Sequence, residues 1–122
     1  MTGPVLYGIP NCDTVKRALA WLEDRGIEHR FHDFKKGGVP ADRMDYWIAA
    51  LGWEALLNRQ GTTWRKLDDA VKAGVTDAAS ARAAMTAHVS LIRRPVVEWP
   101  SGEITVGFTH DSFKQHTREA LM

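Results

Sequence analysis

The hydrophobic period changes twice within the first 34 residues, and no other feature of the sequence constrains the fold as strongly. Residues 4–9 form a short apolar run that ends at Pro10, as a buried strand would. From Asp13 the apolar residues recur with helical spacing, and Gly26 is typical of a helix stop. Residues 27–34 then alternate imperfectly, which favours a second strand. Strand, helix and strand at this spacing predict a βαβ unit with parallel strands and a right-handed crossover.

A helical stretch and a hairpin account for the rest of the chain. Between about residues 40 and 90 the pattern predicts three helices: Pro40–Gly52, residues 62–74 with Thr62 or Thr63 as the N-cap, and a third helix entered through Thr76 or Asp77. In residues 62–74, Trp64, Leu67 and Val71 fall on one face. The last part of the chain predicts the strands Val96–Trp99 and Glu103–Phe108, and a closing helix that Asp111 caps and that runs through Leu121. The short turn between the two strands makes them an antiparallel hairpin.

Without the helical stretch, the order of elements is β-α-β followed by β-β-α, which is the order of a thioredoxin-like fold. A chain of 122 residues suits one domain. We therefore predict a single α/β domain of the thioredoxin-like fold over residues 1–122, with a helical insertion at about residues 40–90 between its two halves.

Composition and charge restrict the binding partners and the cellular compartment that we expect for the protein. Sixteen basic residues against fifteen acidic ones give a formal net charge of +1, too balanced to predict binding to nucleic acid or to an anionic membrane. The single cysteine cannot form an internal disulfide, which favours a reducing compartment. The sequence has neither the apolar length of a membrane span nor the pattern of a signal peptide. We expect a cytoplasmic monomer that contacts neither nucleic acid nor membranes.

That single cysteine, Cys12, stands where the strand pattern gives way to the helix. At the N-cap or N1 position, the N–H groups of the first turn point at its sulfur and the helix dipole favours a negative charge. The dipole alone contributes about 0.3–1 kcal/mol, less than the roughly 1.36 kcal/mol of one pKa unit. A mostly ionised thiol therefore also needs direct N–H contacts and a fixed cation. Lys16 can reach back from the next turn, whereas Asp13 opposes the effect. The alternative is an inert core cysteine.

The histidines do not predict a metal site. His29 and His32 are three residues apart on a predicted strand, so they face opposite sides. His110 and His116 are too loosely spaced for a local site, and His88 stands alone. We expect no bound metal.

Three motifs carry a resemblance to a known family: Asn-Cys-Asp-Thr at residues 11–14, Gly-Thr-Thr-Trp-Arg-Lys-Leu at residues 61–67, and Arg-Arg-Pro at residues 93–95. With them the sequence resembles the arsenate reductase-like family that includes the Spx regulators, and within it the branch of small proteins called YffB. The resemblance covers nearly the whole chain. It implies a thioredoxin-like domain with a helical insertion and a reactive cysteine at Cys12.

The resemblance also implies that Arg94 lies beside this thiol and that the Arg94–Pro95 peptide bond is cis. Arg94 would then supply the fixed cation, with a planar fork that suits a carboxylate or an oxyanion. Pro95 opens a predicted strand, where a residue without an N–H is tolerated. Arg93 is either a solvated neighbour or part of the substrate site.

Departures from the family pattern bear on the substrate. Arsenate reductases of this family bind their oxyanion through three arginines, and at the matching positions this chain has Arg94, Asn58 (or Arg59, if the loop shifts) and Phe108. The histidine that those enzymes carry four residues before the cysteine is replaced by Gly8. One or two cations bind a multiply charged arsenate weakly, so we rank arsenate reduction last.

Two other functions are then weighed. The first, which we favour, is a glutathione-dependent thiol-disulfide oxidoreductase. Cys12 attacks a disulfide or glutathionylated substrate and forms a mixed disulfide. An external thiol, most simply glutathione, completes the cycle because the chain has no second cysteine. The alternative is a regulator that docks on RNA polymerase as Spx proteins do, although Val15 stands where those often carry a second cysteine.

The glutathione hypothesis predicts a set of site residues. Arg94 holds a glutathione carboxylate, and the backbone before Pro95 pairs with the tripeptide as an added strand. The predicted catalytic residues are Cys12 and Arg94, and the predicted substrate-binding residues are Asn11, Lys16, Asn58, Thr62, Thr63, Arg93 and Pro95. No cofactor is expected to stay bound. Glutathione is a co-substrate, and a glutaredoxin is a further candidate partner.

Overall fold

A computed structural model describes residues 3–121, with side chains up to residue 117; the ends of the predicted domain, residues 1–2 and 122, lie outside the described residues. In chain order its elements are β1 (Val5–Gly8), α1 (Asp13–Asp24), β2 (Arg30–Asp33), α2 (Phe34–Gly37), α3 (Ala41–Leu51), α4 (Trp53–Leu56), α5 (Thr62–Lys66), α6 (Asp69–Ala73), α7 (Ala78–Ala87), the 3₁₀ turn η1 (Val89–Leu91), β3 (Val96–Glu98), β4 (Ile104–Val106) and α8 (His110–Leu121). They divide into two compact units. The first combines the two ends of the chain, up to Lys36 and from Arg94, and the second is Gly37–Arg93. Whether the whole chain is a single domain stays a prediction.

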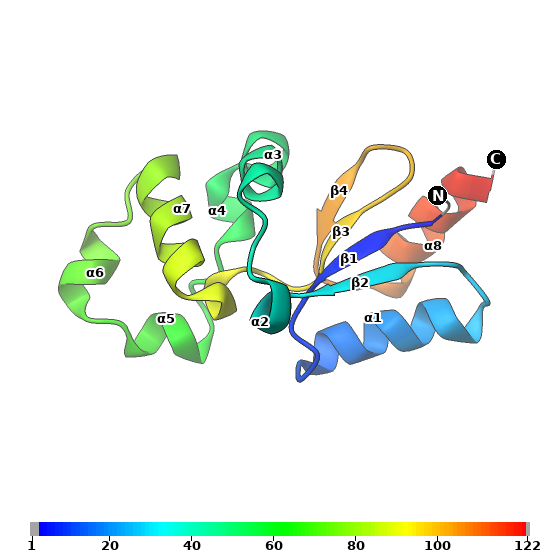
Figure 1. The fold of residues 1–122 in the computed structure, drawn as a ribbon, viewed down its shortest axis with the longest axis horizontal. Coiled ribbons are helices and arrows are strands. Elements are labelled where there is room, and N and C mark those ends of the chain that lie inside the picture. Colours follow the sequence, from blue (N-terminus) through cyan, green and yellow to red (C-terminus); the bar gives the residue numbers. More distant parts are fainter. Residues whose placement is uncertain (1–2, 122) are drawn as a thin grey trace. The chain divides into compact units, whose positions relative to one another are not determined.

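The first unit is built on one mixed sheet. Among the described residues, its strands lie in the order β2-β1-β3-β4 (Figure 1). β1 and β2 are parallel, whereas β3 is antiparallel to both β1 and β4. The parallel pair confirms the predicted βαβ unit, and the antiparallel β3–β4 pair confirms the predicted hairpin. The fold is thioredoxin-like, as the sequence pattern predicts.

Helices α1 and α8 pack on the same face of this sheet. Leu6 of β1 and Val97 of β3 are directly paired and fully buried in this core. Trp21 of α1 and Phe113 of α8 meet there edge to face, with ring centroids 5.8 Å apart. Each square ångström of apolar surface removed from water contributes about 25 cal/mol, so these large side chains hold the two helices to the sheet.

The sequence of α1 explains both its orientation and its end. Val15, Ala18 and Leu22 follow helical spacing and form its buried stripe. Just beyond the helix, Gly26 adopts φ = +64°, a left-handed conformation that strains residues with a side chain. The predicted helix stop at Gly26 is therefore confirmed, and it turns the chain back toward β2.

The closing helix begins slightly earlier than predicted. The Oγ1 atom of Thr109 accepts the N–H of Ser112 at 3.1 Å, and α8 begins at His110. Thr109 therefore caps the helix, and the prediction of Asp111 as the cap is wrong. A threonine hydroxyl that reaches the third N–H of the helix satisfies a donor that would otherwise lack a partner.

The second unit is helical, as predicted, apart from a single antiparallel bridge between Leu57 and Ile92. Helix α7 begins with a capping box: the Asp77 side chain accepts the Ser80 N–H at 2.8 Å, and the Ser80 hydroxyl accepts the Asp77 N–H at 3.1 Å. This confirms Asp77 as one of the two predicted caps. The fully buried side chains of this unit include Trp47, Leu56 and Met85.

The single helix predicted over residues 62–74 is instead two short helices, α5 and α6. Leu67 between them is extended (φ −70°, ψ 150°), and the aspartates that follow favour caps over helix interiors. Val71, predicted on a buried face, is 44% exposed. The N-cap of α5 is Gly61 rather than Thr62 or Thr63, because the preceding loop forms its own turn.

β2 is shorter than the strand predicted over residues 27–34: it begins only at Arg30 and ends at Asp33, because Phe34 begins α2. Phe34 is nonetheless buried, and its ring stacks on that of Tyr7. No helix within residues 3–121 combines the length and the hydropathy needed to cross a bilayer.

Candidate functional site

The junction between β1 and α1 places Cys12 at the N-cap of the helix. Its backbone is extended (φ −138°, ψ 123°), and its carbonyl accepts the Lys16 N–H at 2.9 Å, which closes the first turn. The side chain makes no full capping hydrogen bond, and the thiol is partly exposed. The sulfur is therefore next to the amides of the first turn and open to a reactant.

The environment of Cys12 favours the thiolate. Partial burial raises the pKa of the thiol, but other groups outweigh it, and the pKa lies below its ordinary value. The backbone N–H of Val15 has the largest opposing effect, followed by the hydrogen bond and the charge of Arg94 and then by the N–H of Thr14. Direct N–H contacts and a fixed cation are thus both present at the thiol.

Arg94 reaches this thiol from the loop before β3. The Arg94–Pro95 peptide bond is cis, as the resemblance implied. Pro95 is buried, and its carbonyl accepts the N–H of Gly107 at 2.9 Å, which fixes the loop to the end of β4. Because Arg94 is half-buried, its charge is less screened by solvent than that of a surface cation.

Gly8, the last residue of β1, lies against the same cluster. A Cβ atom at this position would stand 3.0 Å from Cγ2 of Val15 and 3.7 Å from Cβ of Arg94. The first distance is tighter than nine in ten real contacts of a Cβ atom, so a side chain here would require the Val15 methyl to shift by a few tenths of an ångström. Gly8 therefore lets the end of the strand pack closely against Val15 and Arg94.

The other predicted site residues of the first unit border this cluster in sequence. Asn11 precedes Cys12 and is exposed, and Lys16 is exposed one turn along α1. The structure brings Arg94 to Cys12, with Pro95 next to Arg94 in the chain, whereas the roles of Pro95, Asn11 and Lys16 in substrate binding stay predictions.

The remaining predicted residues belong to the second unit. The Asn58 N–H donates to the Leu91 carbonyl at 2.7 Å, and its Oδ1 accepts the N–H of Gln60 at 3.1 Å. This places the side chain in a tight turn, where it supports the start of α5. Thr62 is exposed and Thr63 half-buried in the first turn of that helix, and the Arg93 N–H donates to the Leu56 carbonyl at 2.9 Å. Asn58 thus has a structural role, and substrate contacts by this group stay a prediction.

The tight packing at Gly8 is a part of the site that the sequence does not indicate, because a glycine at a strand end does not reveal which atoms lie against it. The amides of the first turn follow from the helix start predicted at Cys12, and in the structure Val15 and Thr14 supply them. Among the described residues, no group of three or more His, Cys, Asp or Glu side chains gathers as metal ligands.

Replacement of Arg94 by glutamine is expected to raise the pKa of Cys12, because the charge and the charge-assisted hydrogen bond that stabilise the thiolate are lost. The pH profile of alkylation by iodoacetamide would show this as a midpoint at higher pH. Below both midpoints the alkylation rate should fall about threefold for each unit of the rise, since the smaller thiolate fraction outweighs its greater nucleophilicity.

Lys114→Gln, which removes an exposed positive charge of α8, is the matched control and should leave the alkylation midpoint of Cys12 in place. An Arg94→Gln variant that is folded and has an unchanged midpoint would show that Arg94 does not act on the thiol in solution.

Comparisons with known proteins show which proteins share this sequence and fold. The sequence profile of the ArsC family matches residues 7–116. A protein of Haemophilus influenzae, named only as uncharacterised, is 38% identical over 109 residues, which are 89% of this chain and 94% of that protein. The solved structure of a YffB protein has a TM-score of 0.86 and 44% identity, covering 93% of this chain and 97% of that one. A solved arsenate reductase-related protein from Brucella melitensis has a TM-score of 0.74 and 46% identity, covering 97% and 96%.

Proposed function

Because this chain belongs to the ArsC family, we propose that it is a glutathione-dependent thiol reductase that works through Cys12. Its kinship with that family and with an arsenate reductase-related protein makes it a thiol-redox protein. The observation that carries the finer proposal is the state of Cys12: a partly exposed thiol whose pKa lies below its ordinary value beside Arg94. This is the environment of a reactive cysteine rather than of a structural one.

The reaction proceeds in two thiol–disulfide exchanges. First the Cys12 thiolate attacks the glutathione sulfur of a glutathionylated substrate, a new disulfide forms on Cys12, and the substrate leaves as a thiolate. Then the thiolate of a second glutathione attacks the glutathione sulfur on Cys12, which releases oxidised glutathione and restores the Cys12 thiolate. In sum, one glutathione is oxidised, the substrate sulfur is reduced to a thiol, and the proton of the incoming glutathione passes through solvent to that thiol.

The need for an external thiol follows from the sequence. Cys12 is the only cysteine of the chain, so no second cysteine can resolve the mixed disulfide. Glutathione suits the site because its carboxylates match the planar guanidinium of Arg94, which already lies beside the sulfur. We place the protein in the cytoplasm, since a reducing compartment supplies this thiol.

Two measurements test the proposal. Oxidised glutathione is expected to add one glutathione to the wild-type protein, seen as an intact-mass increase that dithiothreitol reverses. A glutathionylated test peptide should then be reduced with glutathione as the only reductant, in a coupled glutathione reductase assay. A Cys12 pKa at or above about 8.5, the ordinary value, together with no adduct, would remove the enzyme proposal.

The two alternatives remain weaker. Phe108 stands where the arsenate reductases of the family have their third oxyanion-binding arginine. Its ring packs edge to face on Phe113, with centroids 4.8 Å apart, and it offers no charge to an oxyanion. Arsenate turnover with glutathione and glutaredoxin would overturn that argument. Docking on RNA polymerase stays a prediction, which a complex that survives Cys12→Ser would support.

A further inference from the structure

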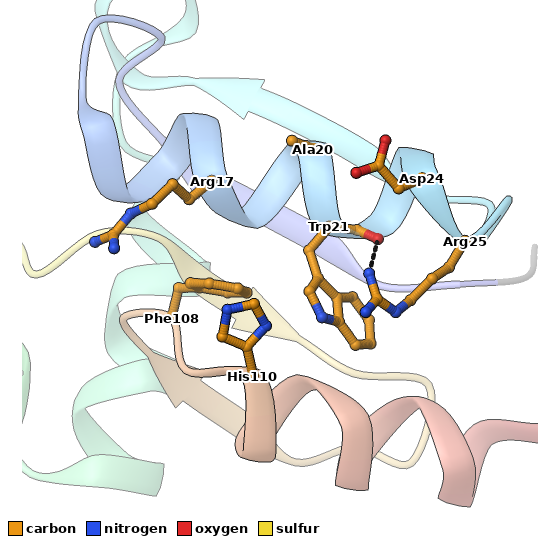
Figure 2. A pocket seen from close by; sticks show the side chains of 7 residues that line it. All are labelled: Arg17, Ala20, Trp21, Asp24, Arg25, Phe108 and His110. Atoms are coloured by element: carbon orange, nitrogen blue, oxygen red, sulfur yellow. Dashed lines mark hydrogen bonds between the residues drawn. The ribbon is translucent and has the colours of Figure 1, made fainter.

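A pocket of about 360 Å³ lies on the first unit, beside α1. The helix contributes Arg17, Ala20, Trp21, Asp24 and Arg25 to its lining. The opposite wall consists of Phe108, from the segment between β4 and α8, and His110, the first residue of α8. Figure 2 shows the rings of Phe108 and His110 opposite the helix, with Arg17 toward one end and Trp21 with Arg25 toward the other.

The aromatic side chains that line this pocket are fixed in place. Trp21 is 6% exposed and belongs to the core of the unit. The Arg25 guanidinium lies 4.0 Å from the centroid of the Trp21 ring and donates a hydrogen bond to the Trp21 carbonyl at 3.2 Å. Phe108 packs edge to face on both Phe113 and His110. These rings therefore present a preformed apolar surface that needs little ordering when something binds.

The volume and the charge of the pocket restrict its occupant. About 360 Å³ is near the lower limit of ligand clefts, enough for one large side chain and part of its neighbours. The lining contains two guanidinium groups, of Arg17 and Arg25, and one carboxylate, of Asp24, so its charge favours an acidic occupant. Aromatic and arginine side chains of this kind are the residues that anchor polypeptides at interfaces.

The pocket begins close to the reactive thiol along the same helix. With a rise of about 1.5 Å per residue, Arg17 lies about 7.5 Å and Trp21 about 13.5 Å along the helix axis from Cys12. An extended polypeptide advances about 3.3 Å per residue. A substrate chain that runs along α1 from the thiol therefore reaches this pocket with the residues two to four positions from its cysteine.

We propose that this pocket binds an aromatic side chain, with an adjacent carboxylate at Arg17, of the polypeptide whose glutathionylated cysteine reacts at Cys12. The proposal rests on the thiol reductase function and adds the substrate class: proteins with an aromatic and an acidic residue two to four positions from the modified cysteine. The covalent steps are those given above, because the pocket holds only the leaving polypeptide.

Two peptides that differ in one residue test the proposal. Both have a cysteine and a glutamate, and three positions from the cysteine one has tryptophan and the other alanine. With the cysteine blocked by carboxamidomethylation, calorimetry is expected to show at least about tenfold tighter binding of the tryptophan peptide, or about 1.4 kcal/mol. With the cysteine glutathionylated, kcat/KM should favour the tryptophan peptide in the same direction.

Ala20→Trp fills the pocket from an exposed position of α1 and should remove the preference for the tryptophan peptide. Turnover of a small substrate, the mixed disulfide of glutathione with 2-mercaptoethanol, should be unchanged. Ala49→Trp, at an exposed alanine of α3, is the matched control and should keep the preference. Arg17→Glu leaves the pocket open but reverses the charge that the peptide carboxylate meets. It should therefore weaken the binding of both glutamate-containing peptides.

The outcomes separate the two proposals. Equal affinities of the blocked peptides for the wild-type protein, or a preference that survives a folded Ala20→Trp variant, would overturn the pocket assignment. A clear binding preference without turnover of any glutathionylated substrate would leave a peptide site and remove the reductase. Turnover of the small disulfide without a peptide preference would keep the reductase and remove the peptide site.

Discussion

Replacement of Cys12 by serine is expected to reduce the turnover of glutathionylated peptide by at least about a thousandfold, to the uncatalysed rate. A serine oxygen cannot form the disulfide intermediate, and Cys12 is the only cysteine that could take its place. The coupled glutathione reductase assay, run beside a blank without protein, measures the loss. The intact mass after treatment with oxidised glutathione should also remain that of the unmodified chain.

The same substitution should leave the fold in place, which makes the loss of activity interpretable. The first turn of α1 is closed by the carbonyl of residue 12, which accepts the Lys16 N–H, and not by its side chain. Serine is moreover one of the preferred N-cap residues. The thermal midpoint should therefore stay equal or rise slightly, and reductase activity within tenfold of wild type would place the chemistry away from residue 12.

The second large effect concerns stability. Phe113→Ala is expected to lower the free energy of unfolding by about 3–5 kcal/mol, the range for a buried phenylalanine. Phe113 is fully buried, and three rings meet it edge to face, from Trp99 at 5.0 Å, Trp21 at 5.8 Å and Phe108 at 4.8 Å between centroids. Truncation leaves a cavity between α1, α8 and the sheet that these rigid rings cannot fill.

Urea unfolding followed by far-ultraviolet circular dichroism measures this loss. Tyr46→Ala is the matched control, because Tyr46 is 39% exposed and its ring is covered on one side by Arg43 at 4.8 Å. That substitution should reduce the free energy of unfolding by about 0.5–1 kcal/mol, the value of an exposed cation–π contact. A loss below about 1 kcal/mol for Phe113→Ala would mean that the core closes around the missing ring.

The sheet and its two covering helices could be predicted because each element has a period of its own. The apolar run of β1, the buried stripe of α1 and the short turn of the hairpin are local signals, and the handedness of the crossover then leaves few ways to connect them. The helical insertion was also visible as a change of period. Its internal breaks were not, because Leu67 keeps the helical spacing while its backbone is extended.

The residues of the site could likewise be predicted from the sequence only in part. Cys12 could be placed from the sequence because an N-cap after a strand is a local feature. Arg94 could not, because spacing does not reveal which distant arginine folds back to a thiol, and only the family resemblance pointed to it. For Asn58 the structure shows a local role, since its side chain accepts the Gln60 N–H in a turn of the second unit. Its part in substrate binding, like those of Thr62, Thr63 and Arg93, stays a prediction.

Gly8 bears on how the reactive sulfur loses its proton, because glycine has no side chain that could accept it. No imidazole at this strand end can therefore act as the base for Cys12. Proton loss at Cys12 is then a prior equilibrium with the surrounding water, biased by fixed dipoles and one guanidinium, and not a step shared with an incoming disulfide. The thiolate fraction of Cys12, and with it the rate of reaction, would therefore rise with the pH of the compartment until the pH exceeds the pKa of the thiol.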